Sequence, residues 1–207
     1  MVKKPTAISS PDIPARERIL RTAHLLFYRD GIRSTGIDKV IAEAGVTKVT
    51  FYRHFPSKDD LIKAFLERRH EIWAKGFNRA ITEYRSSQSA VQRMRDPLAP
   101  VFLAVTDWLR ESTFRGCAFV NTVVEVGPSL PDVFGMAARH KHETAEMILP
   151  LLAGRAHAKE IAWAATLAVD GAVVNAQRGR GSVSEALTGL RLLLGAITKE
   201  FPADQRR

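Results

Sequence analysis

The stretch Gly45-Val-Thr-Lys-Val-Thr-Phe-Tyr-Arg-His-Phe-Pro-Ser-Lys-Asp-Asp-Leu61 predicts the end of a helix-turn-helix that runs into a further helix. Gly45 can adopt a positive φ and so turn the chain between two short helices. Thr47 is a predicted N-cap for the second of these helices. Ser57 and Asp60 have the spacing of a capping box, which predicts that another helix begins there.

The predicted helix 47–55 carries a polar, basic and aromatic face. Such a face suits phosphates and the edges of bases. The residues expected on the DNA side of this helix are Thr47, Lys48, Val49, Thr50, Tyr52, Arg53 and His54. Phe51 and Phe55 are expected to pack inward and hold the helix in place. The chain is therefore predicted to bind DNA.

The charge of the chain is unevenly distributed. The formal net charge of the 207 residues is +9. Residues 1–70 hold 14 Lys and Arg against 8 Asp and Glu, whereas residues 71–207 hold 17 against 14. The first third thus carries +6 of the +9, which suits a nucleic-acid-binding end. Charge alone fits equally well with a merely basic surface.

Cysteine content and hydropathy restrict the class of protein further. Cys117 is the single cysteine, so no disulfide can form within one chain. We expect a cytoplasmic protein, with Cys117 packed inertly and not serving as a redox sensor. The first residues are not followed by an apolar run, and no stretch of 18 uncharged apolar residues occurs. We therefore expect neither a signal peptide nor a membrane span.

Apolar periodicity predicts an all-α fold. We expect a flexible basic arm over 1–13, a helix-turn-helix domain over 14–56 and a second helical domain over 57–207. In the first domain, Thr35 and Asp38 have capping-box spacing for the second helix. In the second domain, the helix that starts at Ser57 is long enough to leave the first domain. The segment 117–126 is interpreted as helix because no strand partner is near, although its valine content also fits a strand.

The last two predicted helices, 158–176 and the one that begins at Ser182 or Ser184, are apolar over much of their surface. In the final helix the apolar residues alternate four and three apart, as in a coiled-coil seam. We predict a four-helix dimer interface formed mainly by residues 158–201. Its predicted members are Leu167, Val174, Val183, Leu187, Leu190, Leu194 and Ile197. The alternative is that the seam belongs to the core of a monomer.

Residues 14–75 resemble the N-terminal domain of the TetR family of transcriptional regulators. The resemblance rests on residues 19–27, Gly31, Thr35, Ile37, Ile41-Ala42, Ala44-Gly45-Val46, Thr47-Lys48, Phe51-Tyr52, Phe55 and Ser57-Lys58. The stretch 115–125 also looks like the ligand-binding domain of one subgroup. Two positions depart from the pattern: Val49 stands where the family often has glycine, and Gly36 is a poor helix former.

The resemblance implies an all-helical homodimer that binds a palindromic double-stranded DNA operator. It further implies a small-molecule effector in the C-terminal domain, and most often repression of transcription. Tyr52 and Lys58 are expected to contact phosphates, as is Thr35 in addition to its capping role. Lys48, Val49, Thr50 and Arg53 are the candidates for base readout. Which of them reach bases does not follow from one sequence.

An effector pocket is a weaker inference from the residues. Aromatic side chains with a few polar anchors suit a small molecule, and the alternative for each is an ordinary place in a helical core. The candidate ligand-binding residues are Phe102, Trp108, Phe119, Asn121, Glu125, Trp163 and Asn175. Glu125 lies in an apolar stretch and needs a partner, for which Arg115, Arg139 or a cationic ligand are candidates.

Other functions are less well supported. No Gly-x-Ser-x-Gly, Gly-x-Gly-x-x-Gly, Walker or His-Glu-x-x-His motif occurs, so we expect no catalytic residues and no cofactor. His142 and Glu146 share a helix face, but a solvated surface is a better interpretation than a metal site. The remaining alternative is a helical module whose basic end binds a protein.

Overall fold

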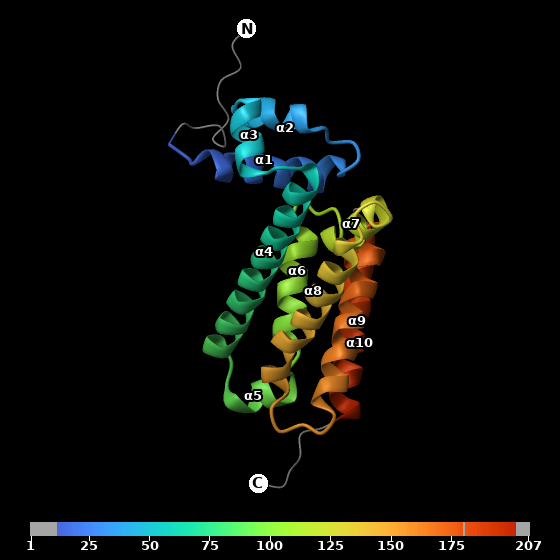
Figure 1. Cartoon of the computed structure of the whole chain (residues 1–207). Coiled ribbons are helices and arrows are strands. Elements are labelled where there is room, and N and C mark those ends of the chain that lie inside the picture. The colour runs from blue at the N-terminus through green and yellow to red at the C-terminus, as the bar shows by residue number, and fades with distance from the viewer. Residues whose placement is uncertain (1–11, 180, 202–207) are drawn as a thin grey trace. The chain divides into compact units, whose positions relative to one another are not determined.

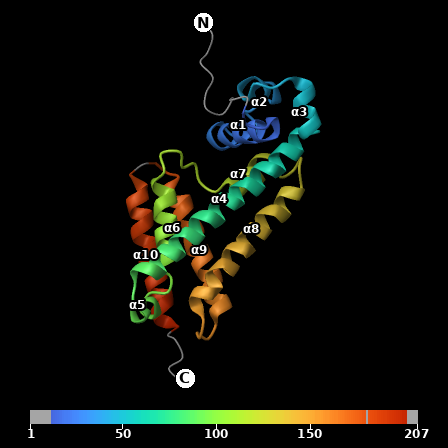
Figure 2. The ribbon, with the colours of Figure 1, turned by 90° about the vertical axis from the view of Figure 1, so that its left-hand side faces the viewer.

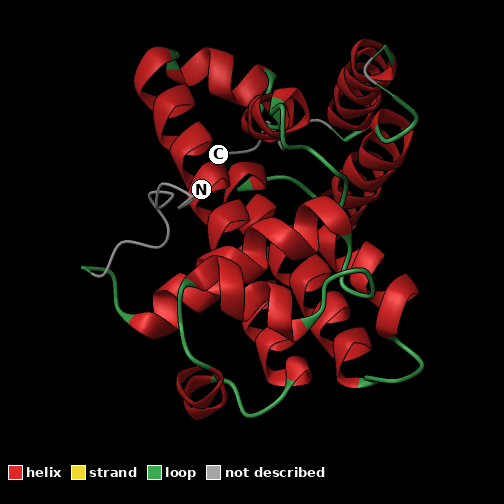
Figure 3. Cartoon of the chain, turned by 90° about the horizontal axis from the view of Figure 1, so that it is seen from above, coloured by secondary structure: helices red, strands yellow, loops and turns green. Residues whose placement is uncertain are grey.

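The computed structural model describes residues 12–179 and 181–201, and in these residues every regular element is a helix (Figures 1 and 3). The helices are α1 (Ala15–Asp30), α2 (Ile37–Ala44), α3 (Lys48–His54), α4 (Lys58–Ser87), α5 (Ala90–Arg95), α6 (Ala99–Arg110), α7 (Ala118–Val126), α8 (Asp132–Ile148), the 3-10 turn η1 (Leu149–Leu152), α9 (Ala158–Ala176) and α10 (Ser182–Glu200). The predicted all-α fold is confirmed. Most of the predicted N-terminal arm, residues 1–11, lies outside the described residues.

Helices α1, α2 and α3 pack on one another through a small apolar core. Ile19, Ala23 and Phe27 of α1 are buried at the spacing of one helix face. Gly45 ends α2 in the left-handed region at φ 61°, where its amide donates to the Ala42 carbonyl. The predicted turn between α2 and α3 is thus confirmed.

The start of α2 differs from the expected capping box. Gly36 is the N-cap of this helix, and no side chain caps it. Thr35 is fully buried, and its hydroxyl donates to the Gly31 carbonyl at 2.7 Å. The capping prediction for Thr35 was wrong because a hydroxyl can also bond back to a carbonyl four residues earlier, and burial favours that bond here.

Helix α4 is the longest element, and at 1.5 Å per residue its 30 residues extend about 45 Å (Figures 1 and 2). Its start is confirmed, because the Asp60 amide donates to Ser57 Oγ at 3.1 Å and the Ser57 hydroxyl bonds to the Asp60 carboxylate at 2.7 Å. The polar stretch 86–89 was predicted to break the helix, and α4 ends within it at Ser87. The short helix α5 that follows was not predicted.

The later helices follow the predicted apolar segments closely. Segment 118–126 is helix α7, so the strand alternative does not hold. Pro150 marks the change from α8 to the turn η1. Helices α9 and α10 run side by side, and α10 also contacts α6 (Figure 1). Within the described residues, no helix combines the length and the apolar character needed to cross a bilayer.

The chain forms two compact units. Within the described residues, the first comprises 12–71 and 118–137, and the second comprises 72–117, 138–179 and 181–201. We call them the head unit and the body unit. The expected linear boundary after residue 56 does not coincide with this division, because α7 and the start of α8 cluster with the head unit. Helix α4 contributes residues to both units.

Candidate nucleic-acid interface

Helix α3 is held in the head unit by aromatic anchors on its inner face. Phe51 and Phe55 are almost fully buried, as expected, with their ring centroids 6.3 Å apart. Arg16 of α1 lies over the Phe55 ring at 5.2 Å. At the start of the helix, the Thr50 amide donates to Thr47 Oγ1 at 3.1 Å, which confirms the predicted N-cap. The helix is therefore presented in a fixed orientation.

The outer face of α3 is exposed and carries two cations. Lys48, Val49, Tyr52 and Arg53 are all exposed, and Val49 has 71% of its surface accessible. Their spacing places them on one side of the helix. Lys48 and Arg53 make no ion pair with a described residue, so both charges are available to phosphates or base edges.

Three other predicted DNA-binding residues are less accessible. Thr50 is half-buried and its hydroxyl lies 2.9 Å from the Thr47 hydroxyl. His54 is also half-buried. Thr35 is buried and hydrogen-bonded to Gly31, so its side chain is not offered to a phosphate. The exposed part of the interface is thus narrower than the sequence predicted.

Lys58 occupies the first turn of α4, where the sequence placed it, but its amine already has a partner. Lys58 Nζ donates to the Ile32 carbonyl at 2.7 Å. Burial lowers the pKa of Lys58, while the nearby Glu125 carboxylate acts in the opposite direction. An ammonium group has three donors, so a phosphate contact is compatible with this bond.

Glu125 has a partner that the sequence did not suggest. Its carboxylate accepts hydrogen bonds from the backbone amides of Ile32 at 2.7 Å and Arg33 at 3.0 Å. The Arg33 side chain in turn donates from Nε to the Glu125 carbonyl. These bonds join α7 to the loop between α1 and α2 inside the head unit. The expectation of an arginine or a ligand as the partner of Glu125 is not met, because backbone amides take its carboxylate.

Gly31 makes room for this carboxylate. Its φ is +90°, and a Cβ there would lie 3.1 Å from a carboxylate oxygen of Glu125. Lys58 donates a hydrogen bond to the Ile32 carbonyl, and Glu125 accepts hydrogen bonds from the Ile32 and Arg33 amides. Loop 31–33 is therefore fixed through both its carbonyl and its amide groups. We call this arrangement of Glu125, Lys58 and loop 31–33 the loop clamp. The only sequence signal for it was a carboxylate in an apolar stretch.

The other candidate ligand residues are divided between the two units. Phe119, which is buried, and Asn121, which is half-buried, belong to the head unit. The remaining four belong to the body unit and do not share one environment there. Trp163 is exposed on α9, with its ring centroid 6.1 Å from that of His142. Asn175 is exposed and donates to the Gly171 carbonyl of its own helix.

Phe102 and Trp108 lie on different sides of α6. They are six residues apart, and because a helix has 3.6 residues per turn, this spacing places the two side chains on different faces. Phe102 lies beneath the Arg191 guanidinium of α10 at 5.2 Å. Trp108 packs against Trp73 of α4, with ring centroids 5.4 Å apart, and meets Phe114 edge to face at 5.5 Å. Trp73 was not among the ligand-binding residues predicted from the sequence.

The Trp73 and Trp108 pair has unused hydrogen-bond donors. Both indole nitrogens are buried, and neither finds an acceptor among the described residues. A buried donor without an acceptor costs about 1–3 kcal/mol. A molecule that brought an oxygen or nitrogen acceptor to this pair would remove that cost.

The predicted dimer residues fall into two groups. Leu187, Leu190 and Leu194 are already buried within one chain, and Leu190 is only 1% exposed. Val183 and Ile197 are half-buried. Leu167 and Val174 of α9, in contrast, are 67% and 60% exposed. The seam of α10 is thus largely the protomer's own core, which was the alternative interpretation.

Apolar residues other than the α10 seam are exposed on the same two helices, and they include the predicted Leu167 and Val174. Leu192 and Leu193 of α10 are 69% and 52% exposed. The exposed residues of α9 recur at Trp163, Leu167 and Val174, four and seven apart on one face. We call Trp163, Leu167, Val174, Leu192 and Leu193 the outer apolar face. Exposed large apolar residues in such a group are typical of an interaction surface.

The three-helix head, in which α2 and α3 are joined by a tight turn and α3 presents an exposed cationic face, defines a helix-turn-helix protein of the DNA-binding class. The family model described as "Bacterial regulatory proteins, tetR family" matches residues 19–65. A TetR-family transcriptional regulator from Streptomyces coelicolor has a similar solved structure. It is 32% identical with a TM-score of 0.74, and the match covers 89% of this chain and 96% of that one. The chain therefore belongs to the TetR family, whose members are DNA-binding transcriptional regulators and not enzymes.

Two further comparisons define the range of this similarity. A TetR transcriptional regulator from Chloroflexus aurantiacus shares the fold at 22% identity, with a TM-score of 0.73 and coverage of 92% of this chain and 97% of that chain. A curated helix-turn-helix transcriptional regulator from Staphylococcus aureus is 31% identical over 83 residues, which are 40% of this chain. The match spans about half, 45%, of that relative.

Proposed function

We propose that the protein is a repressor that binds a palindromic operator as a homodimer and is released by a small-molecule effector. The observation that carries the DNA-binding part is the exposed face of α3. Lys48 and Arg53 are exposed cations there that make no ion pair with a described residue, and Tyr52 offers a hydroxyl on a rigid ring. Phosphate contacts of this kind position a protein on DNA, while neighbouring side chains read the bases.

The outer apolar face supports the dimer. Its leucines and valine would be solvated in a single chain, and a second copy related by two-fold symmetry would cover the same face on both partners. Family members typically pair, and a two-fold protein matches an inverted repeat in DNA. The occupant that we propose for this face is therefore a second copy of the chain.

We place the effector at the Trp73 and Trp108 pair. Aromatic rings provide an apolar wall, and the two unused indole donors suit a ligand with a hydrogen-bond acceptor. Helix α4 carries both Trp73 and, near its start, Lys58 of the loop clamp. A shift of α4 would therefore move both Trp73 and Lys58. Release requires that the effector favour a state whose two heads no longer match about 34 Å of DNA, one helical turn.

The DNA-binding proposal is tested with a pair of substitutions on α3. Tyr52→Phe is expected to weaken binding about fivefold on every sequence, since it removes one hydrogen bond worth about 1 kcal/mol. Arg53→Ala is expected to change which sequence is preferred. Selection from randomised duplexes, followed by titration of the enriched sequences, measures both effects. Lys75→Ala, an exposed lysine of α4 in the body unit, is the control. Failure to enrich any palindrome would overturn the proposal.

The effector proposal is tested without knowing the ligand. Because coupling is reciprocal, operator DNA must alter the effector site, with an expected factor of about 5–150 in affinity. A Trp163→Phe chain retains only Trp73 and Trp108 as emitters, since the sequence holds three tryptophans. Operator is expected to change the quenching of this emission by acrylamide, whereas an unrelated duplex is not. Identical quenching with both duplexes would contradict a switch at this pair.

A further inference from the structure

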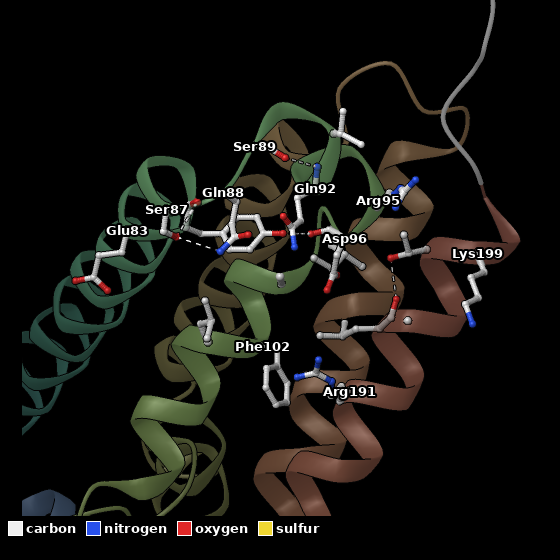
Figure 4. Close-up of a pocket in the computed structure, with 18 residues that line it drawn as sticks. Glu83, Ser87, Gln88, Ser89, Gln92, Arg95, Asp96, Phe102, Arg191 and Lys199 are labelled. Atoms are coloured by element: carbon white, nitrogen blue, oxygen red, sulfur yellow. Dashed lines mark hydrogen bonds between the residues drawn. The ribbon is translucent and has the colours of Figure 1, made fainter.

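A large groove lies in the body unit between the end of α4, α5, α6 and α10 (Figure 4). Its volume is about 960 Å³, near the upper end of the roughly 300–1,000 Å³ of small-molecule sites. The Trp73 and Trp108 pair does not line it. The groove is therefore separate from the effector position proposed above.

Hydrogen bonds hold the α4 and α5 wall of this groove. The Tyr84 hydroxyl donates to the Asp96 carbonyl at 3.0 Å, and Arg93 donates to the Gln88 carbonyl at 2.6 Å. Ser89 caps α5 by accepting from the Gln92 amide at 3.3 Å. The connection between α4 and α6 is therefore fixed in place, and the groove has a defined wall before any ligand binds.

The polar lining has an excess of positive charge. Arg95, Arg191 and Lys199 line the groove, and none of them makes an ion pair with a described residue. Of the two carboxylates that line the groove, Glu83 lies 3.8 Å from Arg79, and Asp96 makes no ion pair within the described part of the chain. Three unpaired cations against one carboxylate favour an anion over a cation.

Arg191 is the cation best placed to receive an anion. In Figure 4 it extends from α10 across the groove toward Phe102, and its guanidinium carbon lies 5.2 Å from the centroid of that ring. Contact with an aromatic face leaves the edge of the guanidinium fork open to a carboxylate or phosphate. The ring also limits the motion of the arginine, so less freedom is lost when an anion binds.

Apolar side chains line the same groove as this cation. Val91 and Leu103 are 60% and 42% exposed, and Leu98 and Leu194 form the buried floor of the same groove. An inorganic anion would leave these surfaces in water, whereas a hydrocarbon chain would cover them. The lining thus combines one anion anchor with an apolar track.

We propose that this groove binds a single molecule of an amphipathic anion. Its acidic head contacts Arg191, and its hydrocarbon part lies along Leu103 and Val91. Carboxylate and phosphate heads share the chemistry that the guanidinium fork recognises. This site goes beyond the proposed regulator function, because binding there requires neither operator DNA nor the Trp73 and Trp108 pair.

The test is calorimetric titration of the full chain, without DNA, at ligand concentrations below micelle formation. Decanoate and decyl phosphate distinguish the two acidic heads, decyltrimethylammonium reverses the charge, and acetate lacks the hydrocarbon part. We expect one decyl anion per chain, bound at least tenfold more tightly than either decyltrimethylammonium or acetate. The tighter of the two anions identifies the head group.

Variants assign the binding to Arg191. Arg191→Met is expected to weaken binding of the decyl anion at least tenfold, and Arg191→Lys to restore part of it, because a lysine keeps the charge without the fork. Arg139→Met, at an exposed arginine of α8 that does not line the groove, is the matched control and should bind as the parent does. The proposal would be overturned if decyltrimethylammonium or acetate bound as tightly as the decyl anion. It would also be overturned if Arg191→Met bound the decyl anion as tightly as the parent chain does.

Discussion

Replacing Leu167 or Leu192 by lysine is expected to convert the protein to a folded monomer and to weaken operator binding at least 100-fold. Both side chains are about two-thirds exposed in a single chain, so a lysine there does not disturb the protomer. In a dimer the same lysine would be buried without a partner, which costs several kcal/mol. Each half-site alone then supplies too little binding energy for the operator.

Sedimentation equilibrium measures the assembly, and circular dichroism shows whether the helices persist. Met94→Lys is the matched control, because Met94 is a 64% exposed apolar residue on α5, outside the outer apolar face. Leu190→Lys serves as a second comparison and should unfold the body unit, since Leu190 lies in the protomer core. A soluble Leu167→Lys dimer that still bound operator would exclude α9 from the interface.

Replacing Glu125 by alanine is expected to lower the free energy of unfolding by about 2 kcal/mol and to weaken operator binding. A hydrogen bond to a charged group contributes about 1.5–3 kcal/mol, and part of the Glu125 side chain is still solvated, so the lower part of that range applies. Loop 31–33 precedes α2, which contacts α3. A less ordered loop is therefore expected to disturb the position of α3, the DNA-binding helix, through α2.

Glu125→Gln separates charge from hydrogen bonding at the loop clamp. The amide oxygen can still accept from the Ile32 and Arg33 amides, but the attraction to Lys58 is lost. We expect less than half the effect of the alanine variant. Hydrogen exchange at the Ile32 and Arg33 amides gives a local measurement, and Val124→Ala, at an exposed neighbour on α7, is the control. Unchanged exchange in Glu125→Ala would show that the clamp does not hold the loop.

The helix-turn-helix was predictable because its signals are local. Gly45 at the turn, Thr47 as N-cap and Ser57 at the start of α4 each act within three residues of their own position, and all three occur in the structure as expected. The apolar composition of 158–176 likewise predicted the bounds of α9, and α7 was interpreted as helix because no strand partner is near in the sequence. Thr35 shows the limit of local rules, because its hydroxyl had two possible partners and burial decided between them.

Partners that are distant in sequence were not predictable. Glu125 needed a partner, and the sequence offered arginines, but the donors are backbone amides 92 and 93 residues away, which no side-chain pattern reveals. Trp73 and Trp108 become neighbours only when α4 and α6 pack. The effector residues proposed from composition are therefore dispersed, since aromatic residues suit a core and a pocket equally well.

Helices α9 and α10 show which question the sequence answered and which only the tertiary structure decided. The sequence predicted two helices with abundant apolar surface and a periodic apolar seam along the second. It could not decide which stripe faces the protomer's own core, because an internal core and a dimer interface both require apolar residues at helical spacing. Packing of α10 against α9 and α6 buries Leu190 and leaves Leu192 exposed. Only the three-dimensional arrangement therefore distinguishes the core stripe of α10 from its exposed stripe.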